Sequence, residues 1–305
     1  MKEAEGMRKT RIRRDSSDTW HHCFNRVAGS SLDRPLGDAE KEMFVRILIR
    51  VSKLYTVRVA AYQIMSNHFH LLLYAPTEEP GPEETCQRYG AFHDGTRTIE
   101  PHGSACRQWQ ARCRDISWFM RHLQHLFTAW YNRTRAPRRR GSLWADRFKN
   151  TILESGLAVW SCWTYIENNP VRAGIVETVA DYRFCSHGIW HQTGCHPFEE
   201  NVLTVMVPML SRLFGLERLA EIRDHLDRAL AEKADREHEK RSFSLTIWRR
   251  VRHWTSGLVI GSELFVREVM RCARRDSTPP RIAHSGEGDE ALLFVWPQIR
   301  WARSG

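Results

Sequence analysis

Apolar residues over the first two hundred positions follow two spacings, one typical of helices and one typical of strands. They recur every three or four residues in 38–54 and in 115–131, which predicts two amphipathic helices. A third helix is predicted from about Gly156 to Asn168, where Pro170 stops it. Shorter runs of β-forming residues predict strands at 19–28, 56–65, 68–76 and 147–154.

The order of these elements predicts the architecture. Strand-helix-strand-strand-helix-strand-helix indicates an α+β protein, in which an antiparallel sheet carries helices on one face, as in the ferredoxin-like βαββαβα fold. Helical spacing returns in 208–236 and 261–275, so the C-terminal region is predicted to be mainly helical. The predicted organisation is a basic flexible arm at 1–17, a core domain at 18–200 with a mobile insertion at 77–114, and a helical region at 201–305.

Charge and composition narrow the class of partner. The chain has 305 residues and a formal net charge of +10, which favours a polyanion such as nucleic acid, although a basic surface can also serve solubility alone. There is no apolar run long enough for a membrane span and no secretory signal, so we expect a cytoplasmic, nucleoid-associated protein without a membrane partner. Its 8 cysteines include no C-x-x-C pair and are expected to be free thiols.

Two histidines, His68 and His70, are candidate metal ligands. Side chains two apart on a strand point to the same face, so both imidazoles would lie together while Phe69 points into the core. Two neutral imidazoles suit a divalent metal such as Mn, Zn or Ni, and a mixed nitrogen and oxygen shell also suits Mg. The alternative is that both are incidental residues of an exposed strand face.

Tyr165 and Asn169 are spaced to share one helix face, because residues four apart lie one turn from each other. The amide oxygen of Asn169 is a candidate third metal ligand, and Tyr165 is a candidate nucleophile. Asn169 precedes Pro170, which disfavours helical geometry at that position. The alternative for Tyr165 is a core tyrosine with a hydrogen-bonded hydroxyl.

Basic residues concentrate in the segment 133–149, which also contains an aromatic side chain suited to stacking on an unpaired base. We predict that this segment contacts DNA phosphates, the alternative being a solvated charged loop. The predicted DNA-binding residues are Arg133, Arg135, Arg138, Arg139, Arg140, Trp144, Arg147 and Lys149.

A second group of candidate metal ligands lies further along the chain. A zinc site is conceivable there, but the spacing matches no common zinc finger, and scattered surface side chains are the favoured interpretation. The group comprises Cys185, His187, His191, Cys195 and His196.

Four stretches resemble, in the right order, the REP-associated tyrosine transposases, relatives of the insertion-sequence transposases that act on single-stranded DNA. They are TWHHCFNRV, AAYQIMSNHFHLLLYAP, WYNRTRAPRRRGSLWADRFKNTILES and YIENNPVRAGIV, and together they cover roughly residues 18–190. The insertion at 77–114 and Ser66, where proline is commoner, depart from the family pattern.

The resemblance implies a ferredoxin-like catalytic domain at 18–200 with Tyr165 as nucleophile. It implies that His68, His70 and Asn169 bind a divalent metal, Mg or Mn, and that the substrate is single-stranded or hairpin DNA. Cleavage would leave a 5′-phosphotyrosine and a free 3′-hydroxyl. The alternative is a domesticated protein that binds hairpin DNA, or regulates its own promoter, without cutting. One catalytic tyrosine per chain fits either a homodimer or a monomer that attacks twice.

Overall fold

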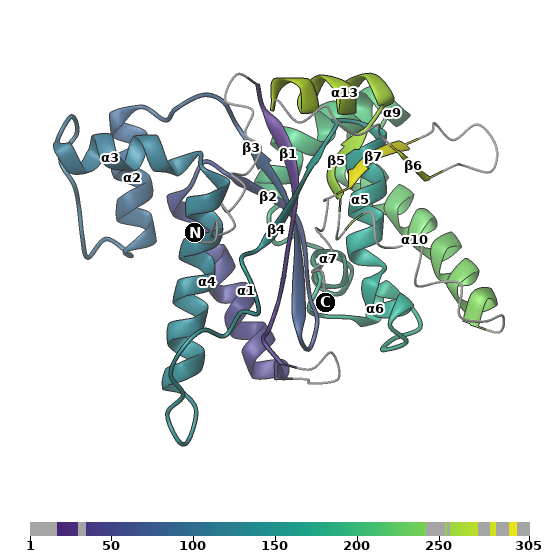
Figure 1. Cartoon of the computed structure of the whole chain (residues 1–305), viewed down its shortest axis with the longest axis horizontal. Helices are drawn as coiled ribbons and strands as arrows, with labels where there is room; N and C mark the ends of the chain where they lie inside the picture. The colour runs from purple at the N-terminus through teal and green to yellow at the C-terminus, as the bar shows by residue number, and fades with distance from the viewer. Residues whose placement is uncertain are drawn as a thin grey trace, which may run out of the picture.

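The computed structural model describes residues 17–29, 35–241, 254, 257–273, 281–284 and 293–297. Within these residues the chain forms an α+β structure built on one sheet (Figure 1), which confirms the α+β part of the predicted fold. The predicted basic arm, residues 1–17, lies outside the described residues except for Ser17.

Four strands form the antiparallel part of the sheet, in the spatial order β2-β3-β1-β4. Along the chain, the main elements of this part follow as β1, α1, β2, β3, α4, β4 and α5, and two further helices precede α4. The strands are β1 Thr19–Arg26, β2 Arg58–Ile64, β3 His68–Ala75 and β4 Lys149–Leu153. The helices are α1 Asp38–Leu54, α4 Ile116–Arg133 and α5 Leu157–Glu167.

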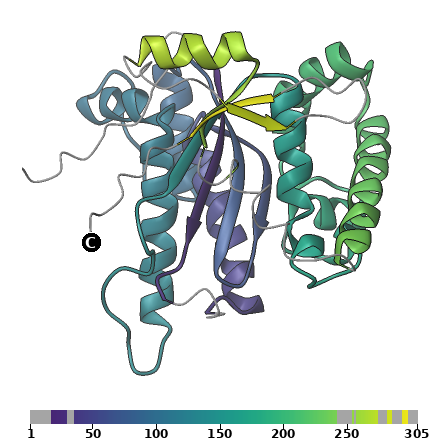
Figure 2. The same cartoon turned by 45° about the vertical axis from the view of Figure 1, so that its right-hand side comes forward.

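Helices cover both faces of this part of the sheet, with α1 and α4 on one side and α5 on the other (Figures 1 and 2). The prediction that helices lie on one face was therefore wrong, because α5 is apolar on nearly all sides and packs against β2 and β3 from the opposite side. On the first side, the ring of Phe69 on β3 lies 4.7 Å from that of Phe44 on α1, between centroids. The ring of Phe127 on α4 lies 5.0 Å from Phe44. Because side chains alternate along a strand, His68 and His70 of β3 face the opposite side, toward α5.

Residues 77–114, predicted as a mobile insertion, fold into two helices, α2 Pro82–Phe92 and α3 Ser104–Cys113. Proline occupies the first turn of α2, where its missing N–H costs no hydrogen bond. Small buried side chains at helical spacing, Cys106 and Cys113, mark the inner face of α3. The sequence signal was weak because these cysteines, and Thr85 of α2, replace the large apolar residues by which an amphipathic helix is usually recognised.

The C-terminal region, predicted to be mainly helical, also adds three strands to the sheet. β5 Gly257–Gly261 pairs in parallel with β4, and the sheet continues through β7 Leu293–Pro297 to β6 Arg281–His284. The sequence did not indicate these strands, because β5 has only 5 residues and its partner in the sheet lies about a hundred positions earlier in the chain. The predicted helices are present as α9 Val207–Phe214, α10 Leu219–Arg241 and α13 Glu263–Cys272.

Short elements connect α5 to α9. They are α6 Asn169–Arg172, the 3₁₀ helix η1 Val179–Asp181, α7 Ser186–Thr193, α8 Glu199–Asn201 and the π-helix η2 Val202–Met206.

None of the described helices combines the length and apolar character needed to cross a lipid bilayer.

Candidate active site

The two predicted histidines of β3 lie side by side, with their ring centroids 5.2 Å apart and the rings perpendicular. His70 is almost fully buried, with 1% of its surface exposed, whereas His68 is partly exposed. The Nδ1 atom of His68 lies 2.7 Å from Oδ1 of Asn67. Imidazoles that bind metals in proteins commonly have one ring nitrogen held by such a neighbour.

A third histidine, His22 of β1, belongs to this cluster and was not predicted. Its Nε2 atom lies 2.9 Å from Nδ1 of His70, and the two rings stack with centroids 5.0 Å apart. Strand register explains the contact: Phe24 pairs with His70, and His22 lies two residues before Phe24 on the same face. Period-two alternation in β1 was the signal that would have found it.

The hydrogen bonds of His22 determine the tautomer of His70. The Nδ1 atom of His22 lies 3.0 Å from the backbone carbonyl oxygen of Trp254, which can only accept, so Nδ1 carries a proton. When both rings are neutral, Nε2 of His22 must accept from Nδ1–H of His70. The lone pair of His70 is then on Nε2, and this is the atom that would bind a metal.

Tyr165 of α5 is brought to the same cluster. Its ring centroid lies 5.8 Å from that of His70 and 5.9 Å from that of His22, edge to face in both cases. The sequence separates Tyr165 from His70 by almost a hundred positions, and packing of α5 over β2 and β3 closes that separation. The predicted nucleophile and one predicted metal ligand therefore share one site.

Burial and charge act in opposite directions on Tyr165. Burial raises the pKa of its phenol, while the guanidinium of Arg172 opposes the rise by its charge and by a hydrogen bond. The Cζ atom of Arg172 lies 4.5 Å from the centroid of the Tyr165 ring. Arg172 was not singled out from the sequence, and it is the cation placed to stabilise a phenolate at this position.

The pKa of His70 is held well below its ordinary value, chiefly by burial and then by the neighbouring His22, His68 and Arg172. A neutral imidazole keeps a lone pair for a metal, whereas an imidazolium does not. The environment of His70 therefore favours the protonation state that a metal ligand requires.

Trp254, from the C-terminal region, covers the site. Its ring stacks on that of Tyr165, with centroids 5.4 Å apart and an angle of 27° between the planes. Tyr165 is only 8% exposed as a result of its packing. The ring of Tyr165 is therefore enclosed, with Trp254 stacked on it.

Asn169 lies next to these residues but not on a continuous helix with Tyr165. The helix α5 ends at Glu167, and Asn169 begins the short helix α6, so the break falls where Pro170 predicts it. The Oδ1 atom of Asn169 accepts a hydrogen bond of 2.8 Å from Nη2 of Arg172. That oxygen is the atom which would bind a metal, so its assignment as a ligand stays a prediction.

Several buried amide groups around the cluster have no hydrogen-bond partner among the described residues. Gln63 pairs with His70 across β2 and β3, is fully buried, and has neither amide atom hydrogen-bonded. The Oδ1 atom of Asn168 and the Nδ2 atom of Asn169 are also buried without a partner. Such groups cost free energy unless something polar occupies the site, so the residues present fit a bound cation with its water or phosphate ligands.

The basic segment extends from the end of α4 to β4. Arg133, Arg138, Arg140 and Arg147 are exposed. Two other predicted residues are engaged within the protein instead. Arg135 forms an ion pair with Glu40, and Arg139 donates hydrogen bonds to Oδ1 of Asn132 at 2.9 Å and to the carbonyl oxygen of Ser142 at 2.7 Å. The Nζ atom of Lys149 lies 5.8 Å from the ring centroid of Phe24, and that ring stacks on His70.

Trp144 does not have the position predicted for a base-stacking residue. Its ring packs into an aromatic group, at centroid distances of 5.3 Å from Phe69 and 5.9 Å from Phe127. Its Nε1–H donates to the carbonyl oxygen of Gln124 at 3.3 Å. The reason is an isolated antiparallel bridge between Val27 and Trp144, which holds this part of the loop against the sheet.

Comparison with known proteins gives limited further information. No protein-family model and no curated protein matches the chain. One similar solved structure is that of a REP-associated tyrosine transposase bound to a REP hairpin. It has 17% sequence identity and a TM-score of 0.40, over 64% of this chain and 90% of that one. At this level of similarity, the comparison by itself assigns neither a family nor an activity to the chain.

Proposed function

We propose that the chain is a metal-dependent transposase or endonuclease that cleaves and rejoins single-stranded DNA, with hairpin repeats as its substrate class. The observation that carries the proposal is the contact between Tyr165 and the histidine pair of His70 and His22. The phenol of Tyr165 packs against the neutral imidazole of His70, and the guanidinium of Arg172 lies next to the phenol ring. This arrangement places a nucleophile beside groups that can activate it. The choice of hairpin DNA rests on the four sequence stretches that resemble the transposases.

The proposed reaction is a transesterification. The phenol oxygen of Tyr165 attacks phosphorus, the bond between phosphorus and the 3′ oxygen breaks, and the proton lost by the phenol is balanced by one gained at the 3′-hydroxyl. Attack by that hydroxyl on the phosphotyrosine reverses the step and rejoins the strand. Arg172 stabilises the phenolate, whose formation burial otherwise opposes.

We propose His68, His70 and Asn169 as the residues that would hold Mg or Mn. A bound divalent cation neutralises negative charge that develops on the phosphate. The chain's own part is to keep His70 neutral and to direct its Nε2 lone pair through His22. For Asn169 to contribute its Oδ1 atom, the hydrogen bond from Arg172 must be exchanged or shared.

The DNA would approach along the exposed arginines of the basic segment, Arg133, Arg138, Arg140 and Arg147, with Lys149 at the inner end. Phosphates bound there release counterions, which gives affinity without sequence preference. The domain assignment that follows is a ferredoxin-like catalytic unit at 18–200. From the later part of the chain, β5, β7 and β6 complete the sheet and Trp254 covers the site.

A second candidate function is the binding of hairpin DNA without cutting. The observation that supports it is the enclosure of the site, since Tyr165 and His70 are buried and Trp254 stacks on the tyrosine. Both functions use the basic segment to bind DNA, and only the first requires the Tyr165 hydroxyl to attack a phosphate.

Incubation of the chain with labelled hairpin DNA and Mn²⁺ or Mg²⁺ distinguishes the cleaving function from the non-cleaving one. We expect a protein–DNA band that survives denaturation, is suppressed by EDTA, and is absent from the Tyr165→Phe variant. That variant should bind the hairpin with an affinity within about twofold of wild type, because it lacks only one hydroxyl. Hairpin binding without any covalent band under both metals would support the non-cleaving function instead.

A further inference from the structure

We propose a second metal site, formed by His187, His191 and Asp227, that binds one zinc ion or a divalent cation of similar preference. Within the described residues, this is the only group of three or more His, Cys, Asp or Glu side chains whose ligand atoms all lie within 4.8 Å of one another. It lies outside the active-site cluster and does not depend on the proposed function.

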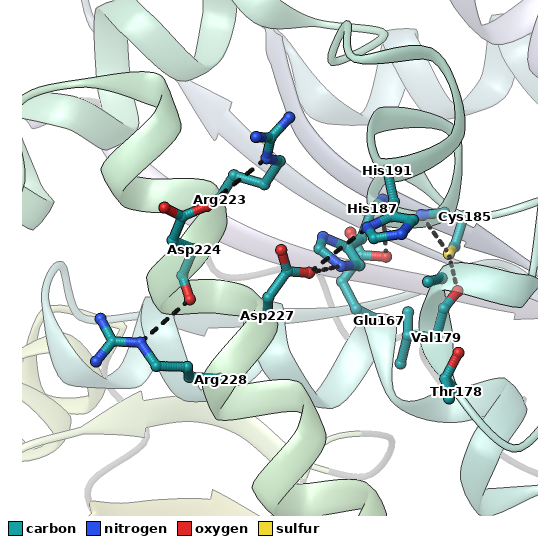
Figure 3. A network of polar contacts seen from close by, with 12 residues as sticks. Glu167, Thr178, Val179, Cys185, His187, His191, Arg223, Asp224, Asp227 and Arg228 are labelled. Atoms are coloured by element: carbon teal, nitrogen blue, oxygen red, sulfur yellow. Dashed lines mark hydrogen bonds and ion pairs between the residues drawn. The ribbon is translucent and has the colours of Figure 1, made fainter.

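The three side chains converge from two helices. His187 and His191 are four residues apart on α7 and therefore point to one side of it, while Asp227 comes from α10 and points toward both (Figure 3). Oδ1 of Asp227 lies 2.8 Å from Nε2 of His187 and 4.0 Å from Nδ1 of His191. Tetrahedral ligands at zinc bond lengths are about 3.3 Å apart, so rotation of the half-exposed Asp227 and the exposed His191 would accommodate the ion.

The donor set determines the class of cation. Two imidazoles and one carboxylate are ligands of zinc and of neighbouring transition metals, whereas Mg²⁺ prefers an oxygen shell. His191 is on the solvent side, with 52% of its side chain exposed, so water can occupy a fourth position. Three protein ligands and one water make a complete tetrahedral shell.

His187 supplies the buried end of the site. Its ring is 2% exposed, and its Nε2 atom faces Asp227 at the point where the three side chains converge. The alternative is a structural histidine that only ties α7 to α10 through Asp227, and the zinc titration below distinguishes the two.

The membership of the site differs from the group that the sequence indicates. Cys185 is fully buried and its Sγ atom accepts a hydrogen bond from the backbone N–H of Gly188 at 3.2 Å. Neither Cys185, Cys195 nor His196 is within the convergent group. The residue that completes it, Asp227, lies 36 positions after His191 in the sequence, and no local spacing pattern would include it.

An ion in this site would link α7 and α10, and both of these helices contact α5. The carboxylate of Glu167 on α5 accepts hydrogen bonds from the Ser186 hydroxyl and, at 3.2 Å, from the backbone N–H of His187. On the other side, Lys233 of α10 contacts Thr164 of α5. The ion would therefore stabilise the position of α5, the helix that carries Tyr165.

The test is a titration of the metal-free full chain with ZnCl₂, followed by isothermal calorimetry and by the thermal unfolding midpoint. A chain carrying His68→Ala and His70→Ala serves as the parent, so that zinc cannot bind at the active-site histidines. We expect one zinc per parent chain and a raised midpoint. Adding His191→Ala or Asp227→Asn should weaken zinc binding at least tenfold and abolish the rise in the midpoint.

The matched control is Asp224→Asn, which removes a carboxylate one turn earlier on α10 that faces Arg223 instead of the histidines (Figure 3). This variant should bind zinc as the parent does. Because His191 and Asp227 are partly exposed, their substitution should leave the fold intact, which the unfolding midpoint without zinc checks. Absence of zinc binding by the parent, or binding unchanged by both ligand variants, would overturn the proposal.

Discussion

The Nε2 atom of His22 lies 2.9 Å from the Nδ1 atom of His70, and the other nitrogen of His22 is held by a backbone carbonyl. This pair orients the imidazole that we propose as a metal ligand, because it fixes which nitrogen of His70 carries the proton. It also makes the metal dependence of the proposed activity sensitive to a residue that does not itself bind the metal.

We therefore expect His22→Ala to raise the Mn²⁺ concentration needed for half-maximal covalent attachment by about 10- to 100-fold, the usual range when a residue that orients a metal ligand is removed. Hairpin affinity measured without metal should stay unchanged, because His22 is only 1% exposed and is not one of the proposed DNA contacts. The amide of His22→Gln can donate to the carbonyl and accept from His70, so this variant should need a Mn²⁺ concentration close to that of wild type. Equal Mn²⁺ requirements in wild type and His22→Ala would show that His22 does not position His70.

The cover over Tyr165 gives a second prediction. Trp254→Ala removes the ring stacked on the phenol and leaves the backbone carbonyl that holds His22. We expect the initial rate of covalent attachment to hairpin DNA to increase several-fold, because less apolar packing must be broken to admit a phosphate. Trp160→Ala, which removes a tryptophan on the other side of α5 against Phe214, is a control for general loosening of that helix. A rate that falls or does not change would mean that Trp254 supports the site and does not limit access.

Much of the site follows from short-range pattern. Alternation along β3 places His68 and His70 on one face, and Tyr165 lies on the helix that is predicted to end before Pro170. His22 follows from the same alternation once β1 is paired with β3, but the pairing register is a long-range property that the sequence of β1 does not contain.

The rest depends on contacts between distant segments. The short strand β5 could not be predicted, because five residues bounded by glycines are stabilised by pairing with β4 and not by their own periodicity. Trp254 reaches Tyr165 only because this later part of the chain returns to the sheet. Trp144 also depends on a distant segment. The sequence predicts it as a base-stacking residue of the basic segment, but its bridge to Val27 packs it against Phe69 and Phe127.

The exposed arginines of the basic segment give a third prediction. Substitution of both Arg138 and Arg140 by alanine should weaken binding of any single-stranded DNA and lower the slope of log affinity against log salt by about 1.4, which is roughly 0.7 for each phosphate that is no longer neutralised. Filter binding at several salt concentrations measures this slope. Arg267→Gln, which removes an exposed arginine paired with Glu263 on α13, is the control and should leave it unchanged. An unaltered slope in the double variant would remove this segment from the DNA path.

Acid should destabilise the fold in part through His21. Burial lowers the pKa of this histidine to about 4, although a hydrogen bond to Asn150 and the charge of Asp115 oppose the shift. The unfolded chain binds a proton at His21 near its ordinary pKa of about 6.5, so between these values the unfolded state holds more protons and stability rises with pH. The contribution is complete above pH of about 6.5 and is lost as the pH falls toward 4.

Replacing His21 by Gln, which keeps a hydrogen-bonding side chain for Asn150 but does not titrate, isolates this contribution. From the two pKa values, wild type should lose about 2.5 kcal/mol more of its free energy of unfolding than the variant between pH 7 and pH 4.5. Urea unfolding of both proteins at the two pH values measures the difference. If both lose the same amount, His21 must be accessible to protons in the folded chain, and the packing of β1 against β4 around Asn150 would have to open at low pH to admit them.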